Sequence, residues 1–372
     1  MVESRVILEV DLKVLKDNFA KISSTVNDCG VISVLKANAY GLGVEPIAKA
    51  LLEAGTKAFG VAELSEALQL TKFNLPVMIL GDVLHSELEL AIQNGVIIPV
   101  SDTITLSKVV EISRRLGKTA LCHFLVDTGM GRLGIPIENA YEFILSAVEF
   151  SNDINFVGIY SHFPVAYRDG SKYTLKQVDL FRELLIKLSE LNITFDMVHI
   201  ANSDAINNFP YTYKEPFNYV RTGINLHGSF DPEGKRILNI KSVLTLKTKL
   251  VAIRKLKAGS NIGYGLTYKL SKDSLVGTIS AGYADGMPLA LSNKGYVIID
   301  NVKCPIVGRV SMDYTNVLLD GVPNPQKGDL VICLGEVGEH SISVEDWAVL
   351  KETHPYEVIC SFGNRVERKY LK

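Results

Sequence analysis

The stretch VISVLKANAYGLGVEPIAKALLEAG (residues 31–55) decides the fold that we predict for this chain. It opens with a short, mostly apolar run rich in β-branched residues (31–35), which is typical of a buried strand. A loop with two glycines follows, and residues 44–55 then carry apolar side chains at helical spacing. A strand, a loop and a helix in this order make one β/α unit, and such units build parallel sheets.

The same pattern recurs along the first two thirds of the chain. Further strand-like runs lie at 58–62, 77–81, 96–100, 121–126, 156–161, 197–201 and 219–226, and most are separated by amphipathic stretches such as 175–191. Eight strands alternating with helices predict a parallel (β/α)8 TIM barrel of the α/β class. An open, doubly wound sheet is the alternative, because periodicity does not distinguish a closed sheet from an open one.

The pattern changes after about residue 235. The segments 242–256, 295–300 and 329–335 are rich in β-branched residues and are separated by Gly, Pro and Asn turns rather than by long helices. We therefore predict a barrel over residues 13–235 and an all-β C-terminal domain over residues 236–372. The run at 5–12 alternates like a strand, so we expect residues 1–12 to supply an N-terminal strand that pairs with the β domain.

Composition excludes several classes of function. The 372 residues carry a net charge of −2 and no basic stripe, which argues against nucleic-acid binding. No apolar run reaches the roughly 18 residues of a membrane span, so we expect no membrane contact from this chain itself. The five cysteines lie far apart without a CxxC pair, and no HExxH spacing occurs, so we expect no metal site and a reducing, cytoplasmic location.

Lys36 is the first candidate for chemistry. It follows the first predicted strand, and active sites of barrels form at the C-terminal ends of the strands. A lysine desolvated there has a lowered pKa and can form a Schiff base with a carbonyl compound. A lysine after a strand is more often a solvated loop residue, but the sequence Asn-Ala-Tyr-Gly-Leu-Gly at 38–43 favours the catalytic interpretation.

Several short segments match a known family in order and spacing. They are VLKANAYGLG (34–43), VDTGMGRLGI (126–135), YSHF (160–163), HIANSDA (199–205), VRTGINLHG (220–228), IGYGLTY (262–268), SAGYADG (280–286), VGRVSMD (307–313) and YEVICSF (356–362). With these segments the chain resembles the alanine racemase family over essentially its whole length. The resemblance implies pyridoxal 5'-phosphate at the C-terminal mouth of the barrel and racemisation of a small amino acid.

The resemblance also implies two proton-transfer residues. Lys36 should hold the cofactor as a Schiff base and move a proton on one face of the substrate Cα, while Tyr264 should act on the opposite face. Racemisation needs this pair, because one base removes the proton and another returns it from the other side. In the family this tyrosine comes from the partner subunit, so the resemblance implies a homodimer with shared active sites.

The other site residues follow from the same resemblance. Arg221 should face the pyridine nitrogen, and because a guanidinium does not give up its proton, that nitrogen stays unprotonated. His162 should flank the ring. Cofactor phosphate should be held by Tyr40, Ser203 and the backbone of Gly223 and Ile224. Substrate carboxylate should be held by Arg132 and by the backbone N–H of Met312, and Asp313 and His199 should support these groups from behind.

Two positions depart from the family pattern. Many alanine racemases carry a lysine, sometimes carbamylated, seven residues before Arg132, where this chain has Leu125, so some other group must orient that arginine. Asn364 stands where the family usually has a tyrosine before the arginine of the closing strand. This asparagine resembles the serine racemase branch, found as catalytic domains of membrane-anchored proteins in vancomycin-resistance clusters.

Asn364 decides the substrate that we predict. An asparagine is shorter than a tyrosine, so we predict that L-serine is converted to D-serine, with alanine as a secondary substrate. On the same resemblance, the chain could be the cytoplasmic catalytic domain of a larger membrane-anchored protein. The first alternative is an alanine racemase without serine preference. The other two are a barrel-type amino-acid decarboxylase and a non-enzymatic carrier of the cofactor.

Two motifs have a plainer interpretation. The run GMGRLG (129–134) matches the glycine pattern of dinucleotide sites, but a proline follows at 136 and the helical pattern starts only near Glu138. We therefore expect no dinucleotide there. His85 and His123 are predicted to be surface or packing residues rather than ligands.

Overall fold

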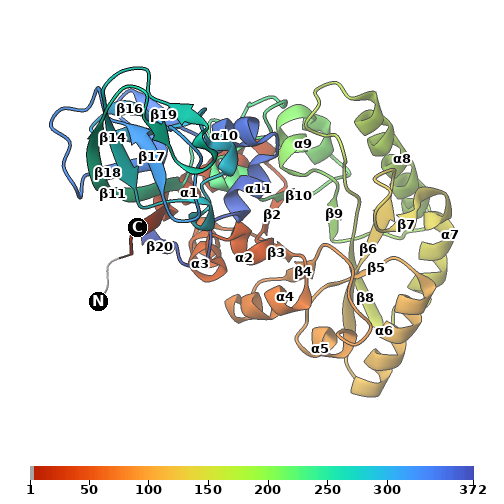
Figure 1. The fold of residues 1–372 in the computed structure, drawn as a ribbon. Helices are drawn as coiled ribbons and strands as arrows, with labels where there is room; N and C mark the ends of the chain where they lie inside the picture. Colours follow the sequence, from red (N-terminus) through yellow and green to blue (C-terminus); the bar gives the residue numbers. More distant parts are fainter. Residues whose placement is uncertain (1–3) are drawn as a thin grey trace.

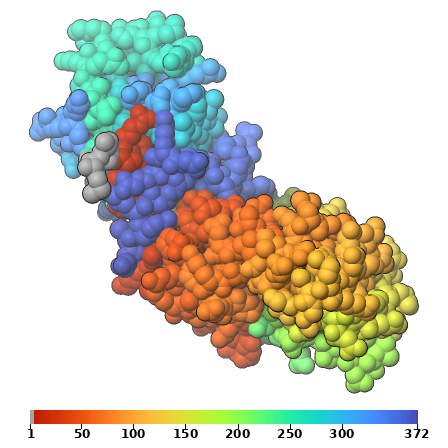
Figure 2. All heavy atoms as spheres, turned by 90° about the horizontal axis from the view of Figure 1, so that it is seen from below, coloured from red at the N-terminus to blue at the C-terminus, as the bar shows by residue number. Residues whose placement is uncertain are grey.

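The molecule consists of two bodies that lie side by side (Figure 1). In this computed structural model residues 4–372 are described, so residues 1–3 of the predicted N-terminal strand segment lie outside the described residues. The first body is the barrel, and the second is a β-rich domain that also includes the red N-terminal strand. The space-filling view shows the two bodies as successive lobes of an elongated molecule (Figure 2).

Eight parallel strands in chain order form the barrel. They are β2 (Gly30–Val34), β3 (Ala58–Val61), β4 (Val77–Ile79), β5 (Ile98–Val100), β6 (Ala120–Asp127), β8 (Ile154–Tyr160), β9 (Met197–His199) and β10 (Tyr219–Thr222). β10 pairs back to β2, and a parallel bridge between Met78 and Ile97 joins β4 to the segment leading into β5. This strand order confirms the predicted barrel rather than the doubly wound sheet.

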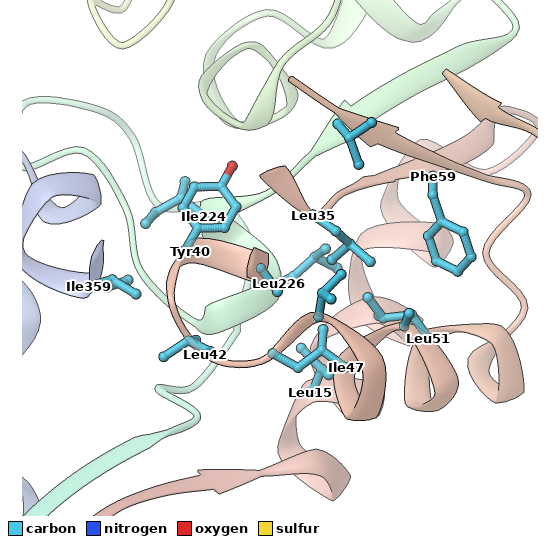
Figure 3. Packing of buried hydrophobic residues seen from close by; sticks show 14 of the residues in the cluster. Leu15, Leu35, Tyr40, Leu42, Ile47, Leu51, Phe59, Ile224, Leu226 and Ile359 are labelled. Carbon is cyan, nitrogen blue, oxygen red and sulfur yellow. The ribbon is translucent and has the colours of Figure 1, made fainter. Parts of the chain in front are cut away.

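The barrel strands are covered by helices on the outside. The helices are α1 (Leu12–Val26), α3 (Val44–Ala54), α4 (Leu64–Leu70), α5 (Leu88–Gln93), α6 (Thr103–Leu116), α7 (Ile137–Val148), α8 (Lys172–Ser189) and α9 (Ser203–Asn208). Side-chain caps fix several starts: the Asp102 carboxylate accepts from two N–H groups of α6, and the Ser171 hydroxyl accepts from Thr174 in α8. Their apolar faces pack on the strands, as Leu15, Ile47 and Leu51 do in Figure 3.

Part of the barrel interior is filled by a small apolar cluster of its own. Ile32, Ala58, Met78, Ile97 and Met197 are all buried and pack together. They come from β2, β3, β4, β9 and the residue before β5, and side chains from these separate strands can meet only inside the ring. The barrel is therefore closed by packing below the mouth, and any ligand site lies above this layer.

The C-terminal domain is built around the long strand β11 (Leu244–Leu256). One path through its sheet runs β16, β15, β18, β11, β1 and β20, while β14 pairs with β11 and β17, and β19 pairs with β18. β1 (Val6–Asp11) runs antiparallel to β11 and parallel to β20. The other bounds are β12 (Asn261–Ile262), β13 (Tyr268–Lys269), β14 (Ser274–Ile279), β15 (Tyr296–Ile299), β16 (Val302–Pro305), β17 (Thr315–Leu318), β18 (Leu330–Val337), β19 (His340–Ile342) and β20 (Glu367–Leu371).

This domain is mostly β rather than all-β. Two helices, α10 (Val344–Lys351) and α11 (Pro355–Cys360), interrupt the strands. Local sequence explains both: Ser343 and Asp346 form a capping box at the start of α10, and Pro355 occupies the first turn of α11. Short 3-10 turns complete the chain at Thr71–Phe73, Pro210–Tyr213, Ile224–His227, Tyr264–Leu266, Tyr283–Asp285 and Leu289–Leu291.

None of the helices within residues 4–372 combines the length and the apolar character that a bilayer span requires.

Candidate active site

A cavity of about 540 Å³ opens at the C-terminal ends of the barrel strands. Its walls include most of the residues that the sequence predicts for the barrel side of the site. These are Lys36, Tyr40, Arg132, His162, Ser203, Arg221 and Gly223, and Leu125 lies among them. They lie at the ends of several strands or in the segments that follow them, which converge here because the closed ring of strands points all its C-terminal ends to one side.

Lys36 stands at the start of an unusual turn. It opens α2 (Lys36–Tyr40), in which residues 37–40 all have φ between 52° and 60°, the left-handed region that costs non-glycine residues energy. Two side chains hold the turn: Asn38 Oδ1 accepts from the N–H of Val44 at 2.8 Å, and the Glu66 carboxylate accepts from the N–H of Ala37. The lysine is therefore presented to the cavity by a backbone that surrounding contacts keep in place.

The environment of Lys36 favours its neutral form. Desolvation within the cavity lowers the pKa of Lys36 from its ordinary value, and the nearby Arg132 guanidinium lowers it further. A neutral amine is the nucleophilic form, and it is also the form that can accept a proton.

Hydroxyl and amide groups gather around Gly223. The N–H of Gly223 donates to Ser203 Oγ at 3.1 Å, and Tyr356 also hydrogen-bonds to Ser203. A Cβ at position 223 would collide with the phenolic oxygen of Tyr40, so only glycine fits there. Figure 3 shows Tyr40 beside Ile224, which begins the following 3-10 turn. Such a cluster of donors is suited to a phosphate group.

Arg221 is buried and makes donor contacts only. It donates to the carbonyl oxygens of Ser161 at 2.8 Å and Ile200 at 3.2 Å, and it contacts Nδ1 of His162 at 3.1 Å and Nδ1 of His199 at 2.5 Å. Because the guanidinium has no acceptor, both Nδ1 atoms accept and both histidines carry their proton on Nε2. Burial lowers the pKa of Arg221 to about 10, so it stays charged at neutral pH.

Arg132 lies on a loop that Asp127 shapes. The Asp127 carboxylate accepts from the N–H groups of Gly129, Met130 and Gly131 at 2.7–2.9 Å. These are the amides that a dinucleotide phosphate would need, and α7 begins only at Ile137, as the sequence predicts. Within residues 4–372 no side chain hydrogen-bonds or ion-pairs with Arg132, so the expected group that orients it is not among these residues.

The predicted residues of the β domain are not in this cavity. Tyr264 is 73% exposed and Met312 is 52% exposed. Tyr264 lines a separate hollow of about 330 Å³ together with Gly263, Arg309, Ser311 and Asn316. Asn364 is exposed and does not line the Lys36 cavity. A single chain therefore brings together the residues predicted for the barrel side, whereas Tyr264, Met312, Asp313 and Asn364 stay apart from them.

Comparison with known proteins agrees with this division into two parts. The family model described as "Alanine racemase, N-terminal domain" matches residues 10–231, and "Alanine racemase, C-terminal domain" matches residues 243–370. The chain belongs to the alanine racemase family. A relative from Halothermothrix orenii named alanine racemase is 37% identical over 367 residues, covering 97% of this chain and 96% of the relative.

Solved structures of the family have the same fold. Alanine racemase from Streptomyces lavendulae superimposes with a TM-score of 0.92 at 29% identity, covering 100% of this chain and 98% of that chain. Alanine racemase from Bartonella henselae, solved with covalently bound pyridoxal phosphate, has a TM-score of 0.88 at 31% identity and covers 99% of this chain and 100% of that chain.

Within this alanine racemase fold, Arg365 fixes the loop that carries Met312. Its guanidinium donates to both carboxylate oxygens of Asp285 at 2.7 and 2.9 Å, to Asp313 Oδ1 at 2.7 Å and to the carbonyl of Met312 at 3.2 Å. Arg5, from the N-terminal segment, also contacts Asp313 at 3.1 Å. The two arginines lower the pKa of Asp313, so it is a carboxylate at neutral pH.

Some cavity residues were not singled out from the sequence. Asp204 follows Ser203 directly, and burial together with Asp231 raises the pKa of Asp204 to about 7. His354 Nδ1 lies 3.4 Å from Asp231 Oδ2, and Tyr356 reaches the cavity from α11. Asp204 and Tyr356 both stand inside segments that carry the family resemblance, which was a usable signal. For His354 and Asp231 no sequence signal exists, because only the tertiary fold brings them to the cavity.

Proposed function

We propose that this chain is a pyridoxal-phosphate-dependent alanine racemase. The observation that carries the proposal is the joint position of Lys36, the Gly223 cluster and Arg221 around one cavity. Membership in the family and the alanine racemases of known structure support it.

The residues present fit the cofactor. Lys36 would hold its aldehyde carbon, the donors around Gly223 would hold its phosphate, and Arg221 would face its ring nitrogen. The fit of the phosphate is supported by the glycine at 223, where a Cβ would collide with the Tyr40 hydroxyl. When bound, pyridoxal phosphate acidifies the Cα–H bond of an amino acid joined to it.

The chain's own residues then move the proton. The Lys36 amine, whose pKa is lowered, accepts or returns the α-proton on one face of Cα. Arg132 lines the same cavity and would bind the substrate carboxylate, which fixes the direction of the Cα–H bond. The opposite face of Cα requires a second acid/base. We assign no further group of the described chain in the cavity to this role. We therefore assign it to Tyr264 of the partner subunit.

A homodimer follows from this assignment. The β domain exposes several large apolar residues: Leu266 next to Tyr264 in sequence, and Tyr283, Met312 and Tyr314 around Ser311, which lines the same hollow as Tyr264. Exposed apolar and aromatic side chains of this kind are typical of protein–protein interfaces. We propose that a second copy of this chain covers them, so that Tyr264 and the N–H of Met312 complete the site of the other subunit.

Alanine is the substrate that the comparisons favour. The relatives carry the name alanine racemase, which supports the alternative of the sequence analysis better than its first choice of serine. Serine is kept as a second candidate substrate for one reason, the short amide side chain of Asn364. That residue is exposed in the single chain, so it would contact substrate only in the assembled dimer.

The test uses the cofactor-loaded protein and a chiral assay of L-alanine and L-serine in parallel. We expect D-alanine to form and both alanine enantiomers to exchange their α-proton in D2O. Release of CO2 would identify a barrel-type decarboxylase instead. Tight cofactor binding without any α-proton exchange would identify a carrier.

A further inference from the structure

A polar cluster lies inside the barrel, next to Arg221. His123 from β6, Tyr160 from β8 and His199 from β9 are each at most 2% exposed. Their ring centroids lie 5.0–6.1 Å apart, and the Arg221 guanidinium lies 5.3 Å from the centre of the Tyr160 ring. Three polar rings from β6, β8 and β9 therefore meet at one place in the barrel interior.

The local backbone makes room for this cluster. The pairing of β6 with β8 shifts register between Cys122 and His123, because β8 has one extra residue, Val157, before Gly158. Gly158 is the cross-strand partner of His123, and a Cβ at that position would collide with the imidazole. The extra residue of β8 and the glycine that follows it thus leave the space that the His123 ring occupies.

Several hydrogen-bonding groups of this cluster have no partner among residues 4–372. His199 accepts from Arg221 at Nδ1, so its Nε2 is an N–H donor, and it has no acceptor among residues 4–372. In the same part of the chain, both ring nitrogens of His123 and the hydroxyl of Tyr160 have no partner either. Buried polar groups in folded proteins are almost always hydrogen-bonded, and where protein groups do not suffice, ordered water supplies the bonds.

We propose that His123, Tyr160 and His199 bind ordered water inside the barrel, and that this water links His123 to His199 and so holds the Arg221 guanidinium in place. His123 is then a positioning residue: it touches neither cofactor nor substrate but acts through His199. The proposal of a water site is argued from the geometry of these residues alone. Its effect on racemisation rests on the proposed function.

The chain of contacts orients Arg221 without neutralising it. Burial lowers the pKa of His123 to about 3 and that of His199 well below its ordinary value, and the Arg221 charge lowers both further. Both imidazoles are therefore neutral near pH 7. Among the described residues no carboxylate contacts Arg221, so its charge stays directed at the cavity.

The direct test is a high-resolution crystal structure of the cofactor-loaded protein. We expect at least one water within hydrogen-bond distance of His199 Nε2 and of either a His123 ring nitrogen or the Tyr160 hydroxyl. A dry cluster, or direct pairing of His199 with His123, would overturn the proposal. This result does not depend on whether the protein is a racemase.

The functional test is a double-mutant cycle with His123→Leu and His199→Leu. We expect His123→Leu to lower kcat for alanine by roughly 10- to 100-fold through misplacement of Arg221, with KM nearly unchanged. Because His123 acts through His199, the double variant should lose no more than the His199→Leu variant. His123→Gln, which restores a hydrogen-bonding group, should recover part of the loss.

Cys122→Ala is the matched control, since Cys122 is buried on the other face of the same strand. It should leave kcat nearly unchanged even if the melting temperature falls. Losses that add in the double variant would show that His123 acts independently of His199 and would overturn the positioning role. If the unmodified protein racemised nothing, the proposed function would fail, while the crystallographic test of the water site would still decide the inference.

Discussion

The surroundings of Lys36 and Tyr264 differ sharply. Lys36 stands in a cavity whose walls, supporting turn and charge environment are all supplied by the same chain. Tyr264 is 73% exposed on a short hairpin of the β domain. One half of the proposed two-base chemistry is therefore organised by the fold of the monomer, and in our proposal the other half depends on assembly with a second copy.

The difference has its origin in strand pairing. The barrel is a closed ring, so its loops are held from all sides. The strands that flank Tyr264, β12 and β13, pair only with each other and form a separate two-stranded sheet. A hairpin of this kind has little stability by itself and gains it through packing. Ile262 and Tyr268 of this hairpin pack against the β domain of the same chain, so the monomer already holds the hairpin, and assembly would bring its Tyr264 to a cavity.

The largest effect is expected from Lys36→Ala, which removes the group that the barrel side is built around. Racemisation should fall below detection, and borohydride should no longer fix the cofactor to the protein. Lys49→Ala, which removes an exposed lysine from α3, is the control and should change neither readout. A cofactor still fixed to the Lys36→Ala protein would assign the covalent bond to another lysine.

Tyr264→Phe tests the proposed role of the exposed tyrosine as the second acid/base. Loss of one positioned acid/base costs roughly 10²–10⁴-fold in rate, or about 3–5 kcal/mol. Proton abstraction from the L-enantiomer should be lost, whereas Lys36 should still exchange the α-proton of the D-enantiomer in D2O. Tyr268→Phe, in the same hairpin, is the matched control. Equal and mild effects on both enantiomers would contradict the two-base assignment.

Mixing the two inactive variants asks whether Tyr264 acts across the dimer. A mixed dimer of Lys36→Ala and Tyr264→Phe chains has one site with both defects and one intact site. Random exchange of equal amounts should therefore restore about a quarter of full activity. Mass spectrometry of the native complex measures the mixed dimers directly. If mixed dimers form without any activity, Tyr264 acts within its own chain. The contrast between a monomer-built Lys36 side and a dimer-built Tyr264 side would then be wrong.

The sequence predicted the barrel side of the site better than the β side. Strand positions and Lys36 followed from periodicity and from the rule that barrel loops carry function, and both depend on local sequence. The left-handed turn after Lys36 did not follow, because residues 37–40 adopt it under contacts from Glu66 and Asn38 rather than by preference. His123 was predicted only as a surface or packing residue, since the glycine on the neighbouring strand that leaves room for its ring is a tertiary feature.

Asp204→Asn should change stability in a pH-dependent way. The folded protein raises the pKa of Asp204 to about 7, whereas the pKa in the unfolded chain is near 4. Between about pH 4 and pH 7 the folded state therefore keeps a proton on Asp204 that the unfolded chain has lost. Stability contributed by this group is therefore present at low pH and lost as pH rises from about 4 to 7. Asn cannot ionise, so at pH 8 the variant should be more stable.

The size of the Asp204 effect is limited by solvent. The shift sets an upper bound of about 4 kcal/mol, and water that reaches the half-buried carboxyl reduces it to about 1–2 kcal/mol. Urea unfolding of the cofactor-free protein at pH 5 and pH 8 measures it. The gain should be full at pH 8 and about a third as large at pH 5, and an equal gain at both would mean that a contact changed rather than a charge. Asp153→Asn, a surface carboxylate paired with Arg114, is the control.

The smallest expected effect concerns Asn364, and it decides which region recognises the substrate side chain. The segment around it packs against the loop that carries Ala284 and Gly286, so it belongs to the β domain rather than to the cavity wall. If Asn364 reaches the substrate in the dimer, its amide can hydrogen-bond a hydroxymethyl group, and Asn364→Tyr should lower the ratio of kcat/KM for L-serine to that for L-alanine several-fold. The loss should fall mainly on serine, because a tyrosine leaves room only for a methyl group.

The change in this ratio should be modest. A pocket that only has space for both side chains would separate serine from alanine by only about 10²-fold, and water can replace the serine hydroxyl when alanine binds. Asn364→Gln keeps the amide and is the control. An unchanged ratio in Asn364→Tyr would remove the argument for serine and leave substrate recognition to the barrel side alone.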